Sequence, residues 1–290
     1  METINKNSQT RDWNTLFRSR DTDNIKRLDC SGESINEIHI SSNNCALLTQ
    51  PRRPRIAVIG TRDPSPYGRE YTMKIVSMLA QSSLNPIIIS GLAMGVDTIA
   101  HRSALSNGLQ TVAVLPTGID TIYPLQNREL AEKIQEDPGS ALLTQFPEKT
   151  APMAINFLAR NYVMAALSDL VIVVGSKVKG GAIVTARYAS EYNIPIIALP
   201  GRVDDLRSQG CNDLIREGIA TMSHPETKFI EFIESFIHQE SDTRLIRVDW
   251  DDDGAMMPKE ISIPNSILDD DVADYLSDTY GFCVNSWHEI

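Results

Sequence analysis

The sequence predicts an α/β protein with a doubly wound, mostly parallel sheet, and two observations carry this prediction. From residue 55 onward, short apolar runs alternate with longer stretches whose apolar residues recur at helical spacing. The short runs are almost wholly apolar, which is typical of parallel strands covered by helices on both faces. The 290 residues provide room for one large domain of this kind with small additions. We therefore expect an extended Rossmann-like fold.

The predicted elements follow in chain order. The apolar runs that predict strands are Arg55–Gly60, Pro86–Ser90, Gln110–Leu115, Ala141–Gln145, Leu170–Gly175 and Ile194–Pro200. The stretches that predict the intervening helices are Gly68–Gln81, Val96–Ser106, Asn127–Gln135, Ala154–Ser168 and Gly181–Tyr192. In the first of these helices Tyr71, Ile75 and Leu79 belong to one apolar stripe, as expected for a helix packed on a sheet.

The two ends of the chain differ from this central pattern. Residues 1–50 are polar and carry no strong fold signal, so we expect a short N-terminal extension there. Residues 51–240 are expected to form the Rossmann-like domain, with an amphipathic helix over residues 226–238 as its last element. Residues 241–290 form a small acidic segment. A helix signal over residues 272–280 and a strand signal over residues 281–287 predict a small α+β element within it.

Charge is unevenly distributed along the chain, whose net charge is −11. Residues 51–202 hold 15 Lys and Arg against 11 Asp and Glu, whereas residues 241–290 hold 3 against 12. A mild basic excess is compatible with a phosphate-bearing ligand, although solvated side chains on helix faces also produce it. The acidic segment is interpreted either as a solvated tail or as an interaction module that competes with such a ligand.

Composition also limits the location and the chemistry. No run of 18 apolar residues appears and the N-terminus lacks the apolar core of a secretory signal, so we expect a cytoplasmic protein without a membrane partner. The four cysteines lie far apart without metal-ligand spacing, which predicts reduced thiols and no bound metal.

Glycine and basic residues collect in the strand-to-helix turns and around the helix that precedes the fifth predicted strand. In open parallel sheets, ligands bind beyond the carboxyl ends of the strands, and helix N-termini with free N–H groups attract phosphate. For any single turn, tight strand-to-helix packing explains the glycine equally well. The candidate phosphate-binding residues are Gly60, Thr61, Arg62, Ser90, Gly91, Gly118, Lys149, Arg160, Asn161, Lys177, Lys179, Gly180, Gly181 and Arg202.

The common nucleotide motifs are absent from the sequence. The turn after the first strand reads GTRDPSPYG instead of GxGxxG, and no GxxxxGK[ST] occurs, so neither a dinucleotide nor a Walker-type ATP site is predicted and no cofactor is expected. Asp97 and His101 are four residues apart on one helical face. Because no nucleophile or metal cluster accompanies them, we interpret Asp97 as fixing the glycine turn and His101 as hydrogen-bonded within the fold. No catalytic residue is predicted.

Six ordered blocks of the sequence resemble the signatures of the DprA/Smf family of bacterial DNA-processing proteins. They are GTRDPSPYG (60–68), SGLAMGVDTIAH (90–101), LPTGIDTIYPLQN (115–127), FLARN (157–161), GGAIVTARYASE (180–191) and PGRVDDLRSQGCNDLIREG (200–218). The resemblance implies a Rossmann-like protein that binds single-stranded DNA without sequence preference. It also implies a homodimer that loads a RecA-type recombinase, protects single strands and acts in DNA recombination and natural transformation, and is not an enzyme.

Several departures from the family pattern lie near the turns. Thr144-Gln145 replaces a serine-glutamate pair and Gly175 replaces a glutamate, so the expected pocket loses two acids and becomes more positive. The aromatic residues near the turns that could stack on bases are Tyr67, Phe146, Phe157 and Tyr162, and each is equally well a core residue.

A second function stays open at this point. Nucleotide phosphoribohydrolases of the LOG type have a related fold and use a PGGxGTxxE loop, whose place is taken here by residues 180–191. The second glycine-threonine pair of that loop is missing, and Glu191 is the best remaining candidate for the catalytic carboxylate. A nucleotide-sensing protein of the same superfamily is a related alternative.

Overall fold

The structure is a computed structural model that describes residues 8–12, 37–46, 53–223, 228–241, 243–251, 259–264, 267, 269–280 and 283–289. The chain forms two compact units, Met1–Ile230 and Glu231–Ile290. Each unit is described by itself. The domain boundaries expected at residues 50 and 240 remain predictions.

A nine-stranded sheet forms the centre of the first unit, in the order β1-β2-β6-β5-β4-β3-β7-β8-β9. From β6 to β9 all neighbouring strands are parallel. The fold is therefore the predicted Rossmann-like sheet. Its strands are β1 (Ser8–Asp12), β2 (Glu37–Ser41), β3 (Arg55–Gly60), β4 (Ile87–Ser90), β5 (Thr111–Val114), β6 (Ala141–Thr144), β7 (Leu170–Val174), β8 (Ile196–Ala198) and β9 (Thr221–Met222).

Two strands from the expected N-terminal extension join this sheet. β2 pairs antiparallel with β6, and β1 pairs antiparallel with β2. The strand EIHIS has only Ile38 and Ile40 as apolar residues, and both are buried. So short an alternation is a weak signal in the sequence alone, and pairing with β6 is what makes it a strand.

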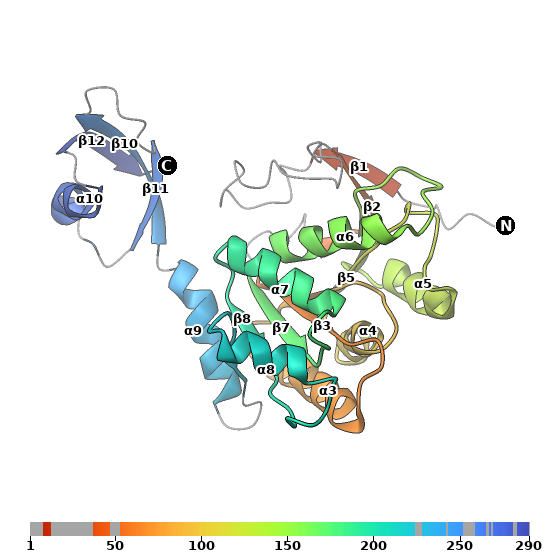
Figure 1. Cartoon of the computed structure of the whole chain (residues 1–290). Helices are drawn as coiled ribbons and strands as arrows, with labels where there is room; N and C mark the ends of the chain where they lie inside the picture. Colours follow the sequence, from red (N-terminus) through yellow and green to blue (C-terminus); the bar gives the residue numbers. More distant parts are fainter. Residues whose placement is uncertain are drawn as a thin grey trace. The chain divides into compact units, whose positions relative to one another are not determined.

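Helices cover the sheet on both faces (Figure 1). α3 packs on α4, which lies against β3, β4 and β5, and α5 lies against β5 and β6. On the other face α6 and α7 pack together over a core that includes Ile59, Val114 and Val173. The helix bounds are α3 (Pro66–Gln81), α4 (Val96–Ser106), α5 (Arg128–Glu136), α6 (Ala154–Ala166), α7 (Gly181–Glu191) and α8 (Gln209–Arg216), with a short 3-10 turn η2 (Leu125–Asn127).

The strand order places a switch point beside β3. β3 pairs with β4 on one side and with β7 on the other, so the chain winds away from β3 in both directions. The loops that follow β3 and β7 therefore lead to helices on opposite faces of the sheet. Such divergence leaves a crevice beyond the carboxyl ends of the two strands, and this crevice is where open α/β sheets bind ligands.

The second unit is a small α+β element. β10 (Thr243–Asp251) lies between β11 (Glu260–Pro264) and β12 (Cys283–Glu289) in an antiparallel sheet. The predicted helix over residues 272–280 is α10 (Val272–Tyr280), preceded by the 3-10 turn η3 (Asp269–Asp271). Its Val272 and Leu276 share a buried cluster with residues of β10 and β11, including Ile246.

The helix α9 (Phe229–Ser241) spans the boundary between the units. It was expected over residues 226–238, of which 226 and 227 lie outside the described residues.

Candidate functional site

A cavity of about 450 Å³ opens beyond the carboxyl ends of β3 and β7. The turn after β3, the helix α6 and the loop between β7 and α7 line it. The cavity therefore lies at the switch point of the strand order, where open α/β sheets bind their ligands. The predicted residues that line this cavity are Gly60, Thr61, Arg62, Arg160, Asn161, Lys177, Lys179, Gly180 and Gly181.

The backbone at the base of the cavity is closely packed. A Cβ atom added at Gly60 would lie 2.2 Å from the carbonyl oxygen of Val174 on the neighbouring strand, so only glycine fits there. The next residue continues the pairing, because the Thr61 N–H donates to the Gly175 carbonyl at 2.8 Å. Gly60 therefore serves close strand packing and brings the Thr61-Arg62 turn to the cavity.

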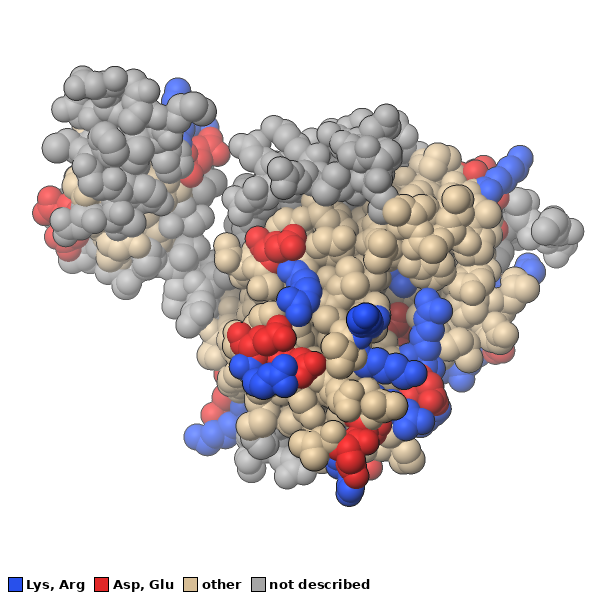
Figure 2. Space-filling model, in the orientation of Figure 1, with Lys and Arg blue, Asp and Glu red and all other residues tan. Residues whose placement is uncertain are grey.

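Three basic side chains surround the opening of the cavity. Arg62, Lys177 and Lys179 are exposed, and within the described part of the chain none of them has an ion-pair or hydrogen-bond partner for its side chain. The Arg62 guanidinium lies 5.4 Å from the centre of the Phe157 ring, at cation–π distance. Figure 2 shows Lys and Arg side chains on the face that carries α7, with Asp and Glu side chains among them. We call Arg62, Lys177 and Lys179 the cationic rim.

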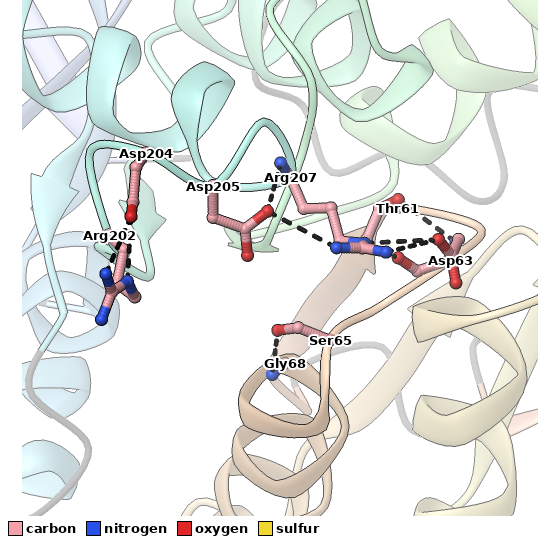
Figure 3. Close-up of polar contacts among 8 residues, drawn as sticks. All are labelled: Thr61, Asp63, Ser65, Gly68, Arg202, Asp204, Asp205 and Arg207. Carbon is pink, nitrogen blue, oxygen red and sulfur yellow. Dashed lines mark hydrogen bonds and ion pairs between the residues drawn. The ribbon is translucent and has the colours of Figure 1, made fainter.

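Asp63, which follows Arg62 in the sequence, is bound by Arg207 from another loop. Arg207, in the loop before α8, donates from Nε to the Asp63 backbone carbonyl and from a terminal nitrogen to the Asp63 carboxylate, each at 2.9 Å (Figure 3). The same guanidinium lies 3.7 Å from the carboxylate of Asp205. Because Asp63 is engaged by Arg207, the positive charge of Arg62 is not neutralised by the residue next to it. Sequence reasoning missed Arg207, since the two partners are 144 positions apart.

Arg160 lies at the wall of the cavity but is buried and hydrogen-bonded within the fold. It donates to the carbonyl oxygens of Gly91 and Val114, the latter at 3.0 Å, and to Asn161 Oδ1 at 3.2 Å. Burial lowers the pKa of Arg160 to about 10, against the attraction of the Asp97 carboxylate. Its exposed fraction is 4%. In this structure Arg160 therefore braces the turn after β4 and has little surface to offer a ligand.

Asp97 and His101 have the scaffold contacts that their sequence positions predict. The Asp97 carboxylate accepts the N–H groups of Gly91 and Ala93 at 3.2 and 3.3 Å, and burial raises its pKa. His101 Nδ1 lies 2.7 Å from the Thr111 hydroxyl, and that hydroxyl donates to the Ile88 carbonyl. Burial lowers the pKa of His101 to about 3, so its ring is neutral at physiological pH.

The structure does not bring five predicted residues to the wall of this cavity, and one of them, Gly91, lines a second cavity instead. The Ser90 hydroxyl is buried and donates to the Val58 carbonyl at 2.7 Å. Gly118 packs against the loop that contains Lys149, since an added Cβ would lie 2.4 Å from the Pro147 carbonyl oxygen. Lys149 is exposed, and Arg202 is paired with Asp204 at 2.8 and 2.9 Å.

A second cavity of about 240 Å³ adjoins the first and shares Arg62, Ala93 and Phe157 with it. Gly91 and Tyr123 also line it, and the Tyr123 ring meets the Phe157 ring edge-on with centroids 5.7 Å apart. Tyr123 is 39% exposed, whereas Tyr162 is in the core beside Tyr188 and Tyr192. Sequence reasoning missed Tyr123, although it follows the third predicted strand in the block LPTGIDTIYPLQN.

Neither a metal centre nor a membrane-crossing helix is found in the part of the chain that the structure describes. Those residues contain no group of three or more His, Cys, Asp or Glu side chains that could hold a metal ion. None of the helices among them is both long enough and apolar enough to cross a bilayer.

Fold and site together define a Rossmann-like protein with a cationic cavity at the switch point of its sheet. Residues 43–234 match the family model described as DNA recombination-mediator protein A. Because this match covers about two thirds of the sequence, the chain belongs to the DprA/Smf family of DNA-processing proteins. The description of this family is that of a recombination mediator.

Individual relatives support this assignment. Protein Smf of Synechocystis is 41% identical over 170 residues, which cover 59% of this chain and 42% of that protein. DprA of Streptococcus pneumoniae is 36% identical over 179 residues, which cover 62% of each chain. The chain thus matches less than two thirds of the length of these curated relatives.

Two solved structures share the fold over about two thirds or more of this chain. DprA of Streptococcus pneumoniae superposes with a TM-score of 0.59 and 34% identity, covering 66% of this chain and 64% of that one. DprA of Helicobacter pylori, solved in a study of its single-stranded DNA binding mode, superposes with a TM-score of 0.64 and 27% identity. The second match covers 78% of this chain and 97% of that one.

Proposed function

We propose that this protein binds single-stranded DNA without sequence preference and acts as a recombination mediator. The observation that carries the proposal is the cationic rim, whose three side chains have no ion-pair or hydrogen-bond partner among the described residues and line one cavity. Arg62 also lines the second cavity beside the Tyr123–Phe157 pair. The similarity to the Helicobacter pylori protein, whose structure concerns single-stranded DNA, points to the same class of ligand.

The arrangement suits a single strand for two physical reasons. Unpaired guanidinium and ammonium groups along a groove attract successive phosphates, and Arg62 can form two parallel hydrogen bonds with one phosphate. The exposed ring of Tyr123, beside the half-buried ring of Phe157, can accept an unpaired base by stacking, which a duplex with its bases inside cannot offer. Lys149 is proposed as a contact farther along the strand, because it is exposed outside the two cavities.

The wider cellular role follows only from the family. Protection of single strands, loading of a RecA-type recombinase, assembly as a homodimer, a cytoplasmic location and a part in natural transformation are all proposals for this chain. The description of the matching family as a recombination mediator supports them.

The geometry of the site does not support the alternative function of a phosphoribohydrolase. Glu191, its best candidate for a catalytic carboxylate, is the last residue of α7, whereas the part of that helix that lines the cavity ends at Thr185. An α-helix rises 1.5 Å per residue, so Glu191 stands about 9 Å along the axis beyond Thr185.

The proposal is tested by mobility shifts with single-stranded and double-stranded oligonucleotides across a salt series. We expect preferential binding of the single strand, and a plot of log affinity against log salt with a slope of about −2 if three phosphates are neutralised. Oligonucleotides of different sequence but equal length serve as the control for specificity. Equal affinity for duplex, or affinity that salt does not change, would contradict the proposal.

We also predict that the acidic segment of residues 241–290 restrains DNA binding. Residues 241–290 hold 12 Asp and Glu against 3 Lys and Arg, and this charge lowers the potential that an approaching phosphate chain meets. A chain that ends after residue 241 is expected to associate with single strands about tenfold faster at low salt. The difference shrinks as salt shortens the Debye length to about 8 Å. Stopped-flow fluorescence measures the association rates of the full chain and of the shortened chain. Equal rates at low salt would refute the prediction.

A further inference from the structure

Asp63 places a negative charge directly beside the cationic rim. It follows Arg62 in the sequence and lines the same cavity. The Asp63 side chain is 76% exposed, so packing does not keep it from turning toward Arg62. Because consecutive Cα atoms are only about 3.8 Å apart, the two charges interact at short range. An unpaired carboxylate here would lower the positive potential that a phosphate meets at Arg62.

Arg207 binds Asp63 from a different loop and from outside this cavity. Its Nε donates to the Asp63 carbonyl and a terminal nitrogen donates to the Asp63 carboxylate, both at 2.9 Å (Figure 3). Among the described residues, Asp63 belongs to the wall of the cavity and Arg207 does not. Arg207 therefore holds both the backbone and the side chain of Asp63 without being part of the surface that a ligand would meet.

Both partners of this contact are fixed by further hydrogen bonds. The Arg207 N–H donates to the Asp205 carboxylate at 2.9 Å, and its guanidinium lies 3.7 Å from the same carboxylate. The Asp63 N–H donates to the Thr61 hydroxyl at 3.2 Å. The hydrogen bond with Asp63 raises the pKa of Arg207 above its ordinary value, so the guanidinium stays charged. The contact thus joins two ordered loops.

The surroundings of Arg62 would attract an unpaired carboxylate. Burial, and after it the charge of Arg62, lower the pKa of Arg160, so the two guanidinium groups interact with one another. A carboxylate released from Arg207 would be drawn toward these two cations. Because Arg207 compensates the charge of Asp63, Arg62 keeps its donors for an incoming phosphate.

We infer that Arg207 is a positioning residue for DNA binding: it holds the Asp63 carboxylate so that Arg62 stays available to a phosphate. This inference rests on the proposed DNA-binding function and adds to it a residue outside the cavity that acts through another. Arg207 acts through the charge of Asp63, so its loss matters only while position 63 carries a carboxylate.

A double-mutant cycle between positions 63 and 207 tests the inference, with the full chain and a labelled single-stranded oligonucleotide. Arg207→Ala is expected to weaken binding by about three- to fivefold at low salt, as expected for an exposed ion pair. Asp63→Asn is expected to bind at least as tightly as the wild type. The double variant is expected to bind as tightly as Asp63→Asn, because no carboxylate remains to be held.

The salt dependence gives a readout that a merely structural role does not change. If Asp63 neutralises Arg62 in Arg207→Ala, one phosphate contact is lost, and the slope of log affinity against log salt becomes shallower by about 0.7. The double variant is expected to regain the wild-type slope. Arg207→Gln keeps an N–H donor for the Asp63 carbonyl but no charge, so it is expected to behave like Arg207→Ala.

The matched control for the loss of charge is Arg216→Ala. Arg216 is exposed, pairs with the Asp213 carboxylate at 2.9 Å and lines neither cavity. Its replacement removes one positive charge and releases one carboxylate, as in Arg207→Ala, but away from Arg62. We expect this variant to bind single strands like the wild type. Thermal melts verify the fold of every variant.

Three outcomes would overturn the inference. The first is an affinity of Arg207→Ala equal to that of the wild type or of the control. The second is a loss that persists in the double variant, which would mean that Arg207 contacts the strand or only supports the loop. The third is wild-type affinity in Arg207→Gln. If the wild type binds single strands, these outcomes remove only the role of Arg207. If it does not, the proposed function itself fails.

Discussion

Replacing Arg62 by alanine is expected to weaken the binding of single-stranded DNA by roughly ten- to a hundredfold, because a hydrogen bond between charged groups contributes about 1.5–3 kcal/mol. The side chain is exposed and contacts the Phe157 ring, so its loss costs the fold little. Fluorescence anisotropy with a labelled oligonucleotide measures the affinity, and a thermal melt verifies the fold.

The matched control for this change is Arg69→Ala. Arg69 is also exposed and lies on α3, away from both cavities. Each variant loses one positive charge. A difference between their affinities for single-stranded DNA therefore reports the position of the arginine and not the change in net charge. An unchanged affinity in a folded Arg62→Ala protein, or an equal loss in both variants, would remove Arg62 from the DNA site.

The free energy of unfolding is expected to fall as the pH drops below about 6.5. Protonation of His101 in the unfolded chain accounts for part of that loss. The folded protein lowers the pKa of His101 from 6.5 to about 3, so below pH 6.5 the unfolded chain binds a proton that the folded chain excludes. This stabilisation is complete above the unfolded pKa and declines through the window down to about pH 3. At pH 5 the loss from this residue is about 2 kcal/mol relative to pH 7.

The variant His101→Asn tests this assignment, because its amide keeps a donor for Thr111 and has no proton to gain. Urea unfolding at pH 7 and pH 5 gives the change in unfolding free energy for each protein. The wild type is expected to lose about 2 kcal/mol more than the variant between the two pH values. The same loss in both proteins would show that His101 does not carry this pH dependence.

The sheet and its helices could be predicted because their signals are local. Every strand from β3 to β8 lies within a predicted apolar run, and α4 and α10 begin and end where their periodicity predicts. Strands buried on both faces need continuous apolar residues, and helices packed on one face need a stripe. β2 carried too few apolar positions to show this pattern, and only its pairing with β6 reveals it.

The candidate site was predictable only in part. The sequence placed Arg62, Lys177 and Lys179 in turns that follow parallel strands, and these side chains meet at one cavity. The sequence also suggested Arg160. This arginine is buried, whereas most arginines lie at the surface. An arginine that caps carbonyls inside the fold and one that faces solvent look the same in a sequence, because burial depends on which segments pack above it.

The sequence alone therefore determined the layered fold, the edge of the sheet at which the cavity lies, and the family of the chain. Only the tertiary structure decided that Arg207 engages Asp63 and leaves Arg62 unpaired, and that Tyr123 meets Phe157 beside it. The reason is physical. Secondary structure follows from the period of apolar residues along a few turns, whereas the charge and shape of a site depend on side chains that distant loops bring within a few ångströms of one another.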